Sequence, residues 1–415
     1  MMHKLNTTQT SKTYIHYLLI YVAISFGGMA LPAFIGQDLF VLLTFFIGLF
    51  YLVITPENIR PTRYLFFLAI FTFSLFITVL GSGLTIGSVL SILSSLLFTY
   101  AVIAYNPQFL YRRLLRVIFI ISIISVILYT ITRIFGMSFF SFLFPHLLAQ
   151  KAENLAEGYY GYGGFLYRWT YIHQARNCGP FGEPGQYQGV LSAALYLSLY
   201  KKDIFANVKS QFLYITIFTI TILTTLSTNG YIAISIIYIC YYFDPSTNGL
   251  MKRKISKLIL FIIMILFLTP LGKDFIEIAI LKKFVGESGF SIEEDTTGAR
   301  TKGIFEMIDC IQSNPSILFG VGYDELHNLN FNTVSGLPKL LIAVGLLPFS
   351  VFIGGVIYFA YRYTKNIYEM VVVVMLFISM GLGQPHIMNP CLFIMIFSTY
   401  IMRIFYLKRK NVLTI

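Results

Sequence analysis

Apolar stretches separated by short polar breaks run along almost the whole chain. Each stretch approaches the roughly 20 residues that an α-helix needs to cross the hydrocarbon core of a bilayer. Because the stretches recur from end to end, we predict that membrane-spanning helices are the fold itself and not an anchor for a soluble domain. The predicted spans are residues 14–32, 39–54, 64–80, 84–104, 115–135, 185–200, 211–227, 229–243, 257–270, 338–361, 368–383 and 388–406.

The composition agrees with this pattern. Of the 415 residues, 57% are hydrophobic and 12% are charged, whereas soluble domains carry about 25% charged residues. A water-soluble globular fold could not bury so much apolar side chain. We therefore expect an all-α integral membrane protein, a single polytopic domain over residues 1–415 with about twelve transmembrane helices.

The basic residues predict how these helices are oriented. A net charge of +12 could suggest nucleic acid, but the basic residues stand in short clusters between apolar runs, as the positive-inside rule produces, so no nucleic-acid partner is expected. With both termini in the cytoplasm, twenty of the thirty Lys and Arg residues fall on the cytoplasmic side. This orientation depends on a tight outer hairpin at Asn229-Gly230, since the loss of either adjoining span would invert everything downstream.

Two segments, residues 136–184 and 271–336, are too long to be simple turns, and both lie on the outer side in this orientation. Long loops in compact proteins are usually functional or disordered. The first is dense in glycine and aromatic residues, which suits a packed surface that faces sugar. The second contains a predicted amphipathic helix with Ile304, Ile308 and Ile311 on one face.

Arginines in both loops are candidate anion ligands. Arg168 and Arg176 lie in the first loop and Arg300 in the second. The planar guanidinium suits phosphate because it makes two parallel charge-assisted hydrogen bonds. Arg300 falls in the first turn of the predicted helix, where backbone N–H groups would add to the attraction for an anion. The alternative is that these are solvated surface arginines.

Glu183 precedes Pro184 at the mouth of the sixth span. Proline at the first helical position with a carboxylate just before it is a good helix start, so capping alone could explain the pair. In a functional interpretation, the carboxylate holds Arg176 in place or accepts hydrogen bonds from sugar hydroxyls.

His327 is a candidate general base. It follows Gly320 and Gly322, which would let the backbone come close to a ligand. A neutral imidazole can take a proton from a hydroxyl group. A lone loop histidine is more often only polar surface, and His173 and His386 also fall on the outer side.

The loops also contain an acidic run and two cysteines. The acidic run at residues 293–295 has no nearby histidine and is interpreted as solvated loop, so no metal ion and no other cofactor is expected. Of the four cysteines, Cys178 and Cys310 fall on the outer side, one in each long loop. A disulfide between them could form in an oxidising compartment.

Taken in order, these residues resemble a known family. The first outer loop reads Arg176-x-x-Gly179-x-Phe181-x-Glu183-Pro184-Gly185, and the second contains Gly298-Ala299-Arg300, Asn314-Pro315, Gly320-Val321-Gly322 and His327-Asn328. This arrangement on two outer loops of a polytopic protein resembles the Wzy-type O-antigen polymerases and their relatives, the O-antigen ligases.

The resemblance implies a GT-C-like fold and a metal-independent inverting glycosyltransferase. Such an enzyme joins undecaprenyl-diphosphate-linked oligosaccharide repeat units at the periplasmic face of the bacterial inner membrane. Its partners would be those oligosaccharides, membrane lipids and a chain-length regulator of the Wzz type. By the same resemblance the diphosphate-binding residues are Arg176 and Arg300, the catalytic residue is His327, and the supporting residues are Arg168, Glu183, Tyr323, Asp324 and Asn328.

Two other functions stay open at this point. An O-antigen ligase would use the same donor but transfer the glycan to lipid A core, although the Glu183-Pro184-Gly185 turn resembles the polymerases more closely. A flippase for the same lipid-linked oligosaccharide would also have about twelve spans, but it should place charged residues near the bilayer midplane. Here the distinctive residues gather in the outer loops.

Overall fold

The computed structural model describes residues 2–81, 83–143, 150–151, 160–163, 165–170, 173–268, 296–313, 315–329, 331, 335–384 and 387–412. Five of its helices are long and apolar enough to cross a membrane: α3 (Gln37–Ile54), α4 (Thr62–Gly81), α5 (Ile86–Tyr105), α6 (Leu110–Leu143, apolar over Leu110–Gly136) and α16 (Leu346–Tyr363). Three shorter apolar segments are α8 (Val208–Thr224), α17 (Ile367–Gly383) and the part of α18 (Pro390–Val412) over Pro390–Tyr406. The chain is therefore a helical, multi-pass membrane protein.

The remaining elements connect or extend these helices. The other helices are α1 (Met2–Ser25), α2 (Ala30–Ile35), α7 (Pro184–Tyr200), α9 (Thr228–Phe243), α10 (Gly249–Leu268), α13 (Thr296–Ser313), α14 (Glu325–Asn328) and α15 (Gly336–Val344), with 3-10 turns η1 (Glu57–Ile59), η3 (Lys202–Ile204) and η5 (Pro315–Phe319). The strands β1 (Gln150–Lys151), β2 (Tyr160–Gly163) and β3 (Arg168–Thr170) form an antiparallel sheet in that order. Helix lies in each of the twelve segments predicted as spans.

The segment predicted as one span over residues 338–361 is two helices. α15 ends at Val344, α16 begins at Leu346, and Gly345 between them has φ +85°. A Cβ atom on Gly345 would lie 2.6 Å from the carbonyl carbon of Phe319, so the backbone of η5 fills the space beside the break. Apolar residues continue through the break, which is why the hydrophobic pattern did not reveal it.

The hairpin predicted at Asn229-Gly230 lies a few residues earlier. α8 ends at Thr224 and α9 begins at Thr228, and Leu226 in the turn has φ +50°. Gly230 belongs to the first turn of α9, where a Cβ atom would lie 2.9 Å from Ile222. This glycine therefore lets α8 and α9 approach each other and does not form the turn.

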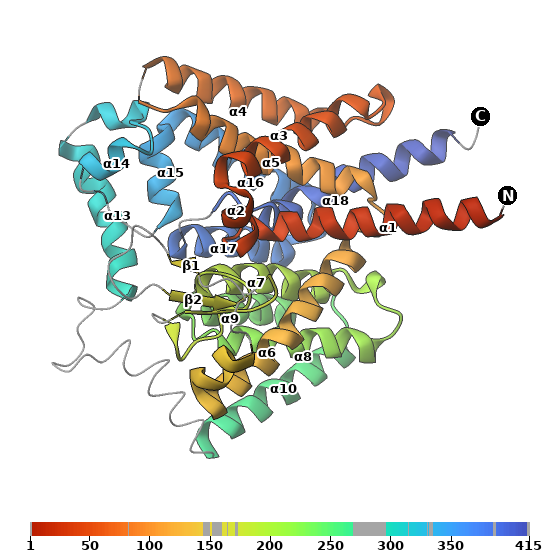
Figure 1. Cartoon of the computed structure of the whole chain (residues 1–415). Coiled ribbons are helices and arrows are strands. Elements are labelled where there is room, and N and C mark those ends of the chain that lie inside the picture. The colour runs from red at the N-terminus through yellow and green to blue at the C-terminus, as the bar shows by residue number, and fades with distance from the viewer. Residues whose placement is uncertain are drawn as a thin grey trace.

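The two ends of the helical bundle differ in what they carry (Figure 1). The start of α1 and the end of α18 lie at one end, on the right of the view, and we call this the terminal end. The strands β1 and β2 lie with α13 and α14 at the opposite end, which we call the loop end. The structure therefore brings the described parts of both long loops to one end of the bundle, away from both termini.

Helix α7 is the central helix of the bundle. It contacts α6, α8, α9, α17 and α18, and every residue of this helix except Gln186 is buried. Its first residue, Pro184, comes directly after the first long loop. The most buried helix therefore begins at the loop end, where it fixes the position of the loop that precedes it.

Candidate functional site

The last part of the first loop is held by specific contacts. The Asn177 side chain accepts a hydrogen bond from the backbone N–H of Gly179 (2.9 Å) and donates one to Thr224 Oγ1 (3.0 Å). Phe181 is fully buried and stacks on Tyr187, with ring centroids 5.3 Å apart. Gly179 has φ +53°, and a Cβ atom there would lie 2.5 Å from the Tyr187 ring. Because only glycine fits this turn, the path of the chain between Arg176 and Glu183 is fixed.

The charges of three residues predicted from the sequence act on the thiol of Cys178. Burial raises the pKa of Cys178 to about 12, while the charges of Arg176 and Arg168 lower it and that of Glu183 raises it. Arg168 and Arg176 are both half-buried, and burial lowers the pKa of each guanidinium. Both remain protonated, because an arginine does not lose its proton in a protein. The structure thus gathers two cations and one carboxylate in a partly desolvated place.

Each arginine is positioned by the loop. Arg168 lies in β3, where it pairs with Gly163 of β2. The guanidinium of Arg168 lies close to Gly182, since a Cβ atom on this glycine would be 3.2 Å from Nη1 of Arg168. Arg176 donates from its backbone N–H to the His173 carbonyl (2.9 Å) and from Nε to the Thr225 carbonyl (3.1 Å). The second bond fixes one edge of the guanidinium against the α8–α9 turn.

Glu183 occupies the N-cap position of α7, and Pro184 is the first helical residue, as predicted. However, the Glu183 side chain makes no capping hydrogen bond. Its charge instead opposes the lowering of the Arg176 pKa by burial. The Glu183 carboxylate therefore acts on the charge of Arg176 and does not cap α7 through its side chain.

The second loop contributes the amphipathic helix α13, which confirms the predicted helix but not its face. The side chains of Met307, Cys310 and Ile311 pack against the core, whereas Ile308 is exposed. The helix begins at Thr296, so Arg300 is its fifth residue and lies past the first turn. The predicted help from the helix N-terminus was therefore wrong, since that effect fades within one turn. The Arg300 side chain lies outside the described part of the structure.

The two glycines before His327 approach the protein's own backbone. Gly320 has φ +90° and Gly322 has φ +83°. A Cβ atom on Gly322 would lie 2.3 Å from the carbonyl oxygen of Gly83, and one on Gly320 would lie 2.7 Å from Thr78. The backbone N–H of Gly322 donates to the Ala343 carbonyl (3.0 Å). These glycines therefore seat the turn against α4, the residues that follow it and α15, and their predicted approach to a ligand stays a prediction.

The residues after this turn lie at the loop end. His327 and Asn328 belong to the short helix α14, whose end residues have side chains outside the described set. Tyr323 is half-buried, and burial raises the pKa of its phenol. Asp324 is exposed. The structure places the backbone of this predicted group beside α15, which α14 contacts.

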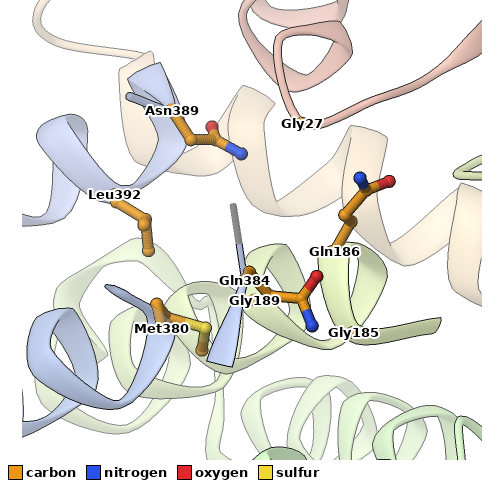
Figure 2. Close-up of a pocket in the computed structure, with 8 residues that line it drawn as sticks. All are labelled: Gly27, Gly185, Gln186, Gly189, Met380, Gln384, Asn389 and Leu392. Atoms are coloured by element: carbon orange, nitrogen blue, oxygen red, sulfur yellow. The ribbon is translucent and has the colours of Figure 1, made fainter. Parts of the chain in front are cut away.

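A small cavity at the loop end was missed from the sequence (Figure 2). It is about 20 Å³ in volume, enough for one water molecule or one hydroxyl group. Figure 2 shows the residues that line it, which come from α7, from the end of α17, from the segment that leads into α18 and from Gly27: Gly185, Gln186, Gly189, Met380, Gln384, Asn389 and Leu392.

Carboxamide groups give this cavity its chemistry. The Oε1 atoms of Gln186 and Gln384 are buried, and neither accepts a hydrogen bond from any residue that the structure describes. Asn389 is 5% exposed, and its Oδ1 accepts from the backbone N–H of Cys391 (2.9 Å) at the start of α18. Two buried acceptors beside a space of this size suit a hydroxyl donor. The signal in the sequence was glutamine at the ends of apolar spans, where polar residues are costly.

The remaining predictions concern the cysteines, two outer histidines and the acidic run. All four cysteines are free, so Cys178 and Cys310 do not form a disulfide. The backbone carbonyl of His173, which is half-buried, accepts from Arg176. His386 and the acidic run at residues 293–295 lie outside the described residues.

The structure thus places Arg168, Arg176 and Glu183 where their charges all act on Cys178, with the carboxamide cavity at the start of helix α7. It places the backbone segments that carry Arg300 and His327 at the same end of the bundle (Figure 1). Comparisons with models of protein families, with curated proteins and with solved structures found no match.

Proposed function

We propose that this chain is a membrane glycosyltransferase of the Wzy type, an O-antigen polymerase that joins undecaprenyl-diphosphate-linked repeat units at the periplasmic face of the inner membrane. The observation that carries the proposal is the cluster around Cys178. Two half-buried guanidinium groups act there on the thiol together with Glu183, the one carboxylate that does so among the described residues. Burial disfavours both cations, and a bound diphosphate would compensate for that cost.

The orientation of the bundle supports this placement. In the proposed topology twelve spans keep both termini in the cytoplasm and present both long loops to the periplasm. The terminal end carries the basic clusters that follow or precede the spans, as the positive-inside rule requires of a cytoplasmic end. The loop end is then where a lipid-linked sugar outside the cytoplasm would meet the arginines.

The proposed reaction needs two functions from the protein. A hydroxyl oxygen of the incoming repeat unit attacks the anomeric carbon of the donor glycan, and the bond from that carbon to the diphosphate oxygen breaks with its electron pair on the leaving lipid diphosphate. Arg176 and Arg300 stabilise the departing anion, and Arg168 and Glu183 hold the charge arrangement in place. His327 accepts the proton of the attacking hydroxyl.

The carboxamide cavity has a role in the same proposal. A sugar hydroxyl that donates to Gln384 Oε1 would use an acceptor that the described residues leave without a donor. Its position at the start of α7, next to Glu183, puts such a hydroxyl beside the arginine cluster. We therefore assign Gln186 and Gln384 to acceptor binding.

The flippase alternative fits the charges less well. Within the described residues, Lys201 lies just after the end of α7 and its partner Glu369 lies in the first turn of α17. The buried Arg113 lies in the first turn of α6, so none of the three is at the middle of a span. Transport pathways instead concentrate ionisable groups near the bilayer midplane. The ligase alternative shares the donor and the arginine cluster, and the deletion phenotype separates it. Loss of a polymerase leaves core with one repeat unit, whereas loss of a ligase leaves uncapped core.

The test is polymer synthesis by the purified protein in vesicles that contain synthetic lipid-linked repeat units, with and without a chelator. We expect His327→Ala and Arg300→Ala to lower the rate by about 10²–10³, the usual cost of removing one group that stabilises a transition state. Arg176→Lys should also be slow, because an ammonium group keeps the charge but not the planar fork. Chelator should have no effect.

Two controls make the result decisive. Arg116→Ala removes an exposed arginine of α6 at the terminal end and should leave the rate unchanged. Gln384→Leu should fold normally, because it removes a buried acceptor that has no partner among the described residues, and it should raise the KM for the acceptor. Full-length polymer made by Arg300→Ala, or labelling that puts residues 176 and 300 on opposite sides of the membrane, would refute the proposal.

A further inference from the structure

A basic groove lies at the terminal end, far from the site described above. It has a volume of about 530 Å³ and lies between the end of α9 and the first turns of α10. Its walls are formed by Tyr242, Gly249, Lys252, Arg253, Ser256 and Lys257. Three cations, and no carboxylate among the described residues, therefore line a space large enough for a phosphate-bearing group.

The acidic residue nearest in sequence is already engaged elsewhere. The Asp244 carboxylate accepts hydrogen bonds from the Ser246 hydroxyl (2.7 Å) and from Asn366 Nδ2 (2.8 Å). Lys252 donates to the Asp244 backbone carbonyl (2.7 Å) and lies over the Tyr242 ring. Arg253 and Lys257 are exposed, and neither is within 4.0 Å of a carboxylate among the described residues. The groove thus keeps a net positive charge.

The apolar surface next to the groove points to an amphiphilic ligand. On α10, Lys257 is followed at intervals of four, three and four residues by Phe261, Met264 and Leu268, so all four share one helix face. Phe261 is 53% exposed, Met264 47% and Leu268 74%. The stripe from Lys257 to Leu268 is about 16 Å long, comparable to one acyl chain. The groove and the stripe form one continuous surface, charged at one end and apolar along its length.

The opposite face of α10 is already used for packing. Met251, Ile255 and Leu258 are buried, and α10 contacts α8. The exposed face is therefore turned outward from the bundle, toward the lipid of a membrane protein. A ligand on this surface would come from the bilayer and not from the interior of the protein.

We propose that the groove lined by Lys252, Arg253 and Lys257 binds the phosphate of an anionic phospholipid whose acyl chain lies along Phe261, Met264 and Leu268. Basic clusters beside a transmembrane helix attract anionic headgroups, and each Lys or Arg near the surface contributes about fivefold in affinity. The bound lipid would hold α10 against the bundle at the terminal end. This inference is independent of the proposed glycosyltransferase activity.

The test measures lipid retained by the full-length protein. Protein in neutral detergent is incubated with dioleoyl phosphatidylglycerol or dioleoyl phosphatidylcholine, and bound lipid is counted by native mass spectrometry. We expect phosphatidylglycerol to bind more tightly. Removal of two charges in Arg253→Gln/Lys257→Gln should weaken its binding about thirtyfold. Both side chains are exposed, so this variant should fold.

The matched control is Lys202→Gln/Lys209→Gln, which removes two other exposed charges, one in η3 and one at the start of α8, and should retain the lipid. Equal loss of lipid in the two double variants, or equal binding of the two lipids, would overturn the proposal. Displacement of the lipid by millimolar glycerol phosphate would show a site for soluble phosphate instead. Binding of dihexanoyl phosphatidylglycerol as tight as that of the long-chain lipid would rule out the acyl stripe.

Discussion

Replacement of Lys201 by methionine should destabilise the protein more than any other loss of a single charge at the terminal end. The Lys201 ammonium lies 2.7 Å from Glu369 Oε1, and the Glu369 side chain is 0% exposed. The same carboxylate accepts from the Tyr196 hydroxyl (2.9 Å) and from the Lys365 backbone N–H (2.7 Å). Without Lys201, the carboxylate would stay buried with two neutral donors and no counter-ion.

The size of the effect follows from this geometry. Breaking a buried ion pair by removal of one partner costs about 3–5 kcal/mol in unfolding free energy. Because two donors to Glu369 remain, we expect Lys201→Met to cost about 3 kcal/mol, the lower limit of that range. Glu369→Gln should cost less, about 1–2 kcal/mol, because the Lys201 side chain is 11% exposed and can turn its ammonium toward water.

The assay is a denaturant titration in detergent micelles, followed by the fluorescence of Trp169, the one tryptophan of the chain. The double variant Lys201→Met/Glu369→Gln should be more stable than the sum of the single effects predicts, by about 1 kcal/mol or more. Glu57→Gln breaks the exposed pair with Arg60, in which the Glu57 side chain is 89% exposed, and should change nothing measurable. Equal costs for Lys201→Met and Glu369→Gln, or strict additivity, would refute the reasoning.

Two further predictions concern the loop end. Gly179→Ala should lower the free energy of unfolding by about 1–2 kcal/mol for the left-handed backbone and by about 1–3 kcal/mol more for the clash with Tyr187. It should also slow polymer synthesis. In the control Gly81→Ala the added Cβ atom meets nothing within 4 Å, so stability and synthesis should both stay unchanged. Cys178 should resist alkylation at pH 8, because burial raises the pKa of its thiol to about 12 and the thiolate is the reactive form. Mass spectrometry of the labelled peptides should find Cys178 modified only after unfolding or as the pH rises toward 12. Because the folded state holds this thiol protonated, its contribution to stability is lost as the pH rises above the ordinary thiol value near 9, and rapid labelling of Cys178 in folded protein at pH 8 would contradict its burial.

The hydrophobic pattern predicted the helices well and their breaks poorly. Segments of apolar residues near 20 in length can lower their energy in a bilayer only as helices, so the pattern determines where helices lie. Breaks such as the one at Gly345 depend on a close contact with the backbone of Phe319, which is distant in the sequence. Hydrophobic periodicity records only residues that are near one another along the chain. The turn that contains Leu226 was predicted a few residues too late, at Asn229-Gly230, because Asn-Gly is a common turn sequence. Gly230 instead allows the close packing of α9 against Ile222 of α8.

The candidate site was predictable in part. Charged residues in an apolar chain are few, so Arg168, Arg176 and Glu183 stood out, and the structure brings their charges together around Cys178. Gln186 and Gln384 are about 200 residues apart in the sequence, and no local pattern joins them. Only the packing of α7 against α17 places their carboxamides on one cavity.

A comparison of the two ends of the bundle explains why the loop end is the better candidate for chemistry. At the terminal end, the buried cation Lys201 has its own buried carboxylate at 2.7 Å, so its charge is neutralised within the protein. Around Cys178, two half-buried guanidiniums share the influence of one carboxylate among the residues that the structure describes. Burial works against both cations there, and a structural role alone would be served as well by neutral side chains. A partly desolvated excess of positive charge is what an anionic substrate would stabilise, and it is why the arginines are the first residues to replace.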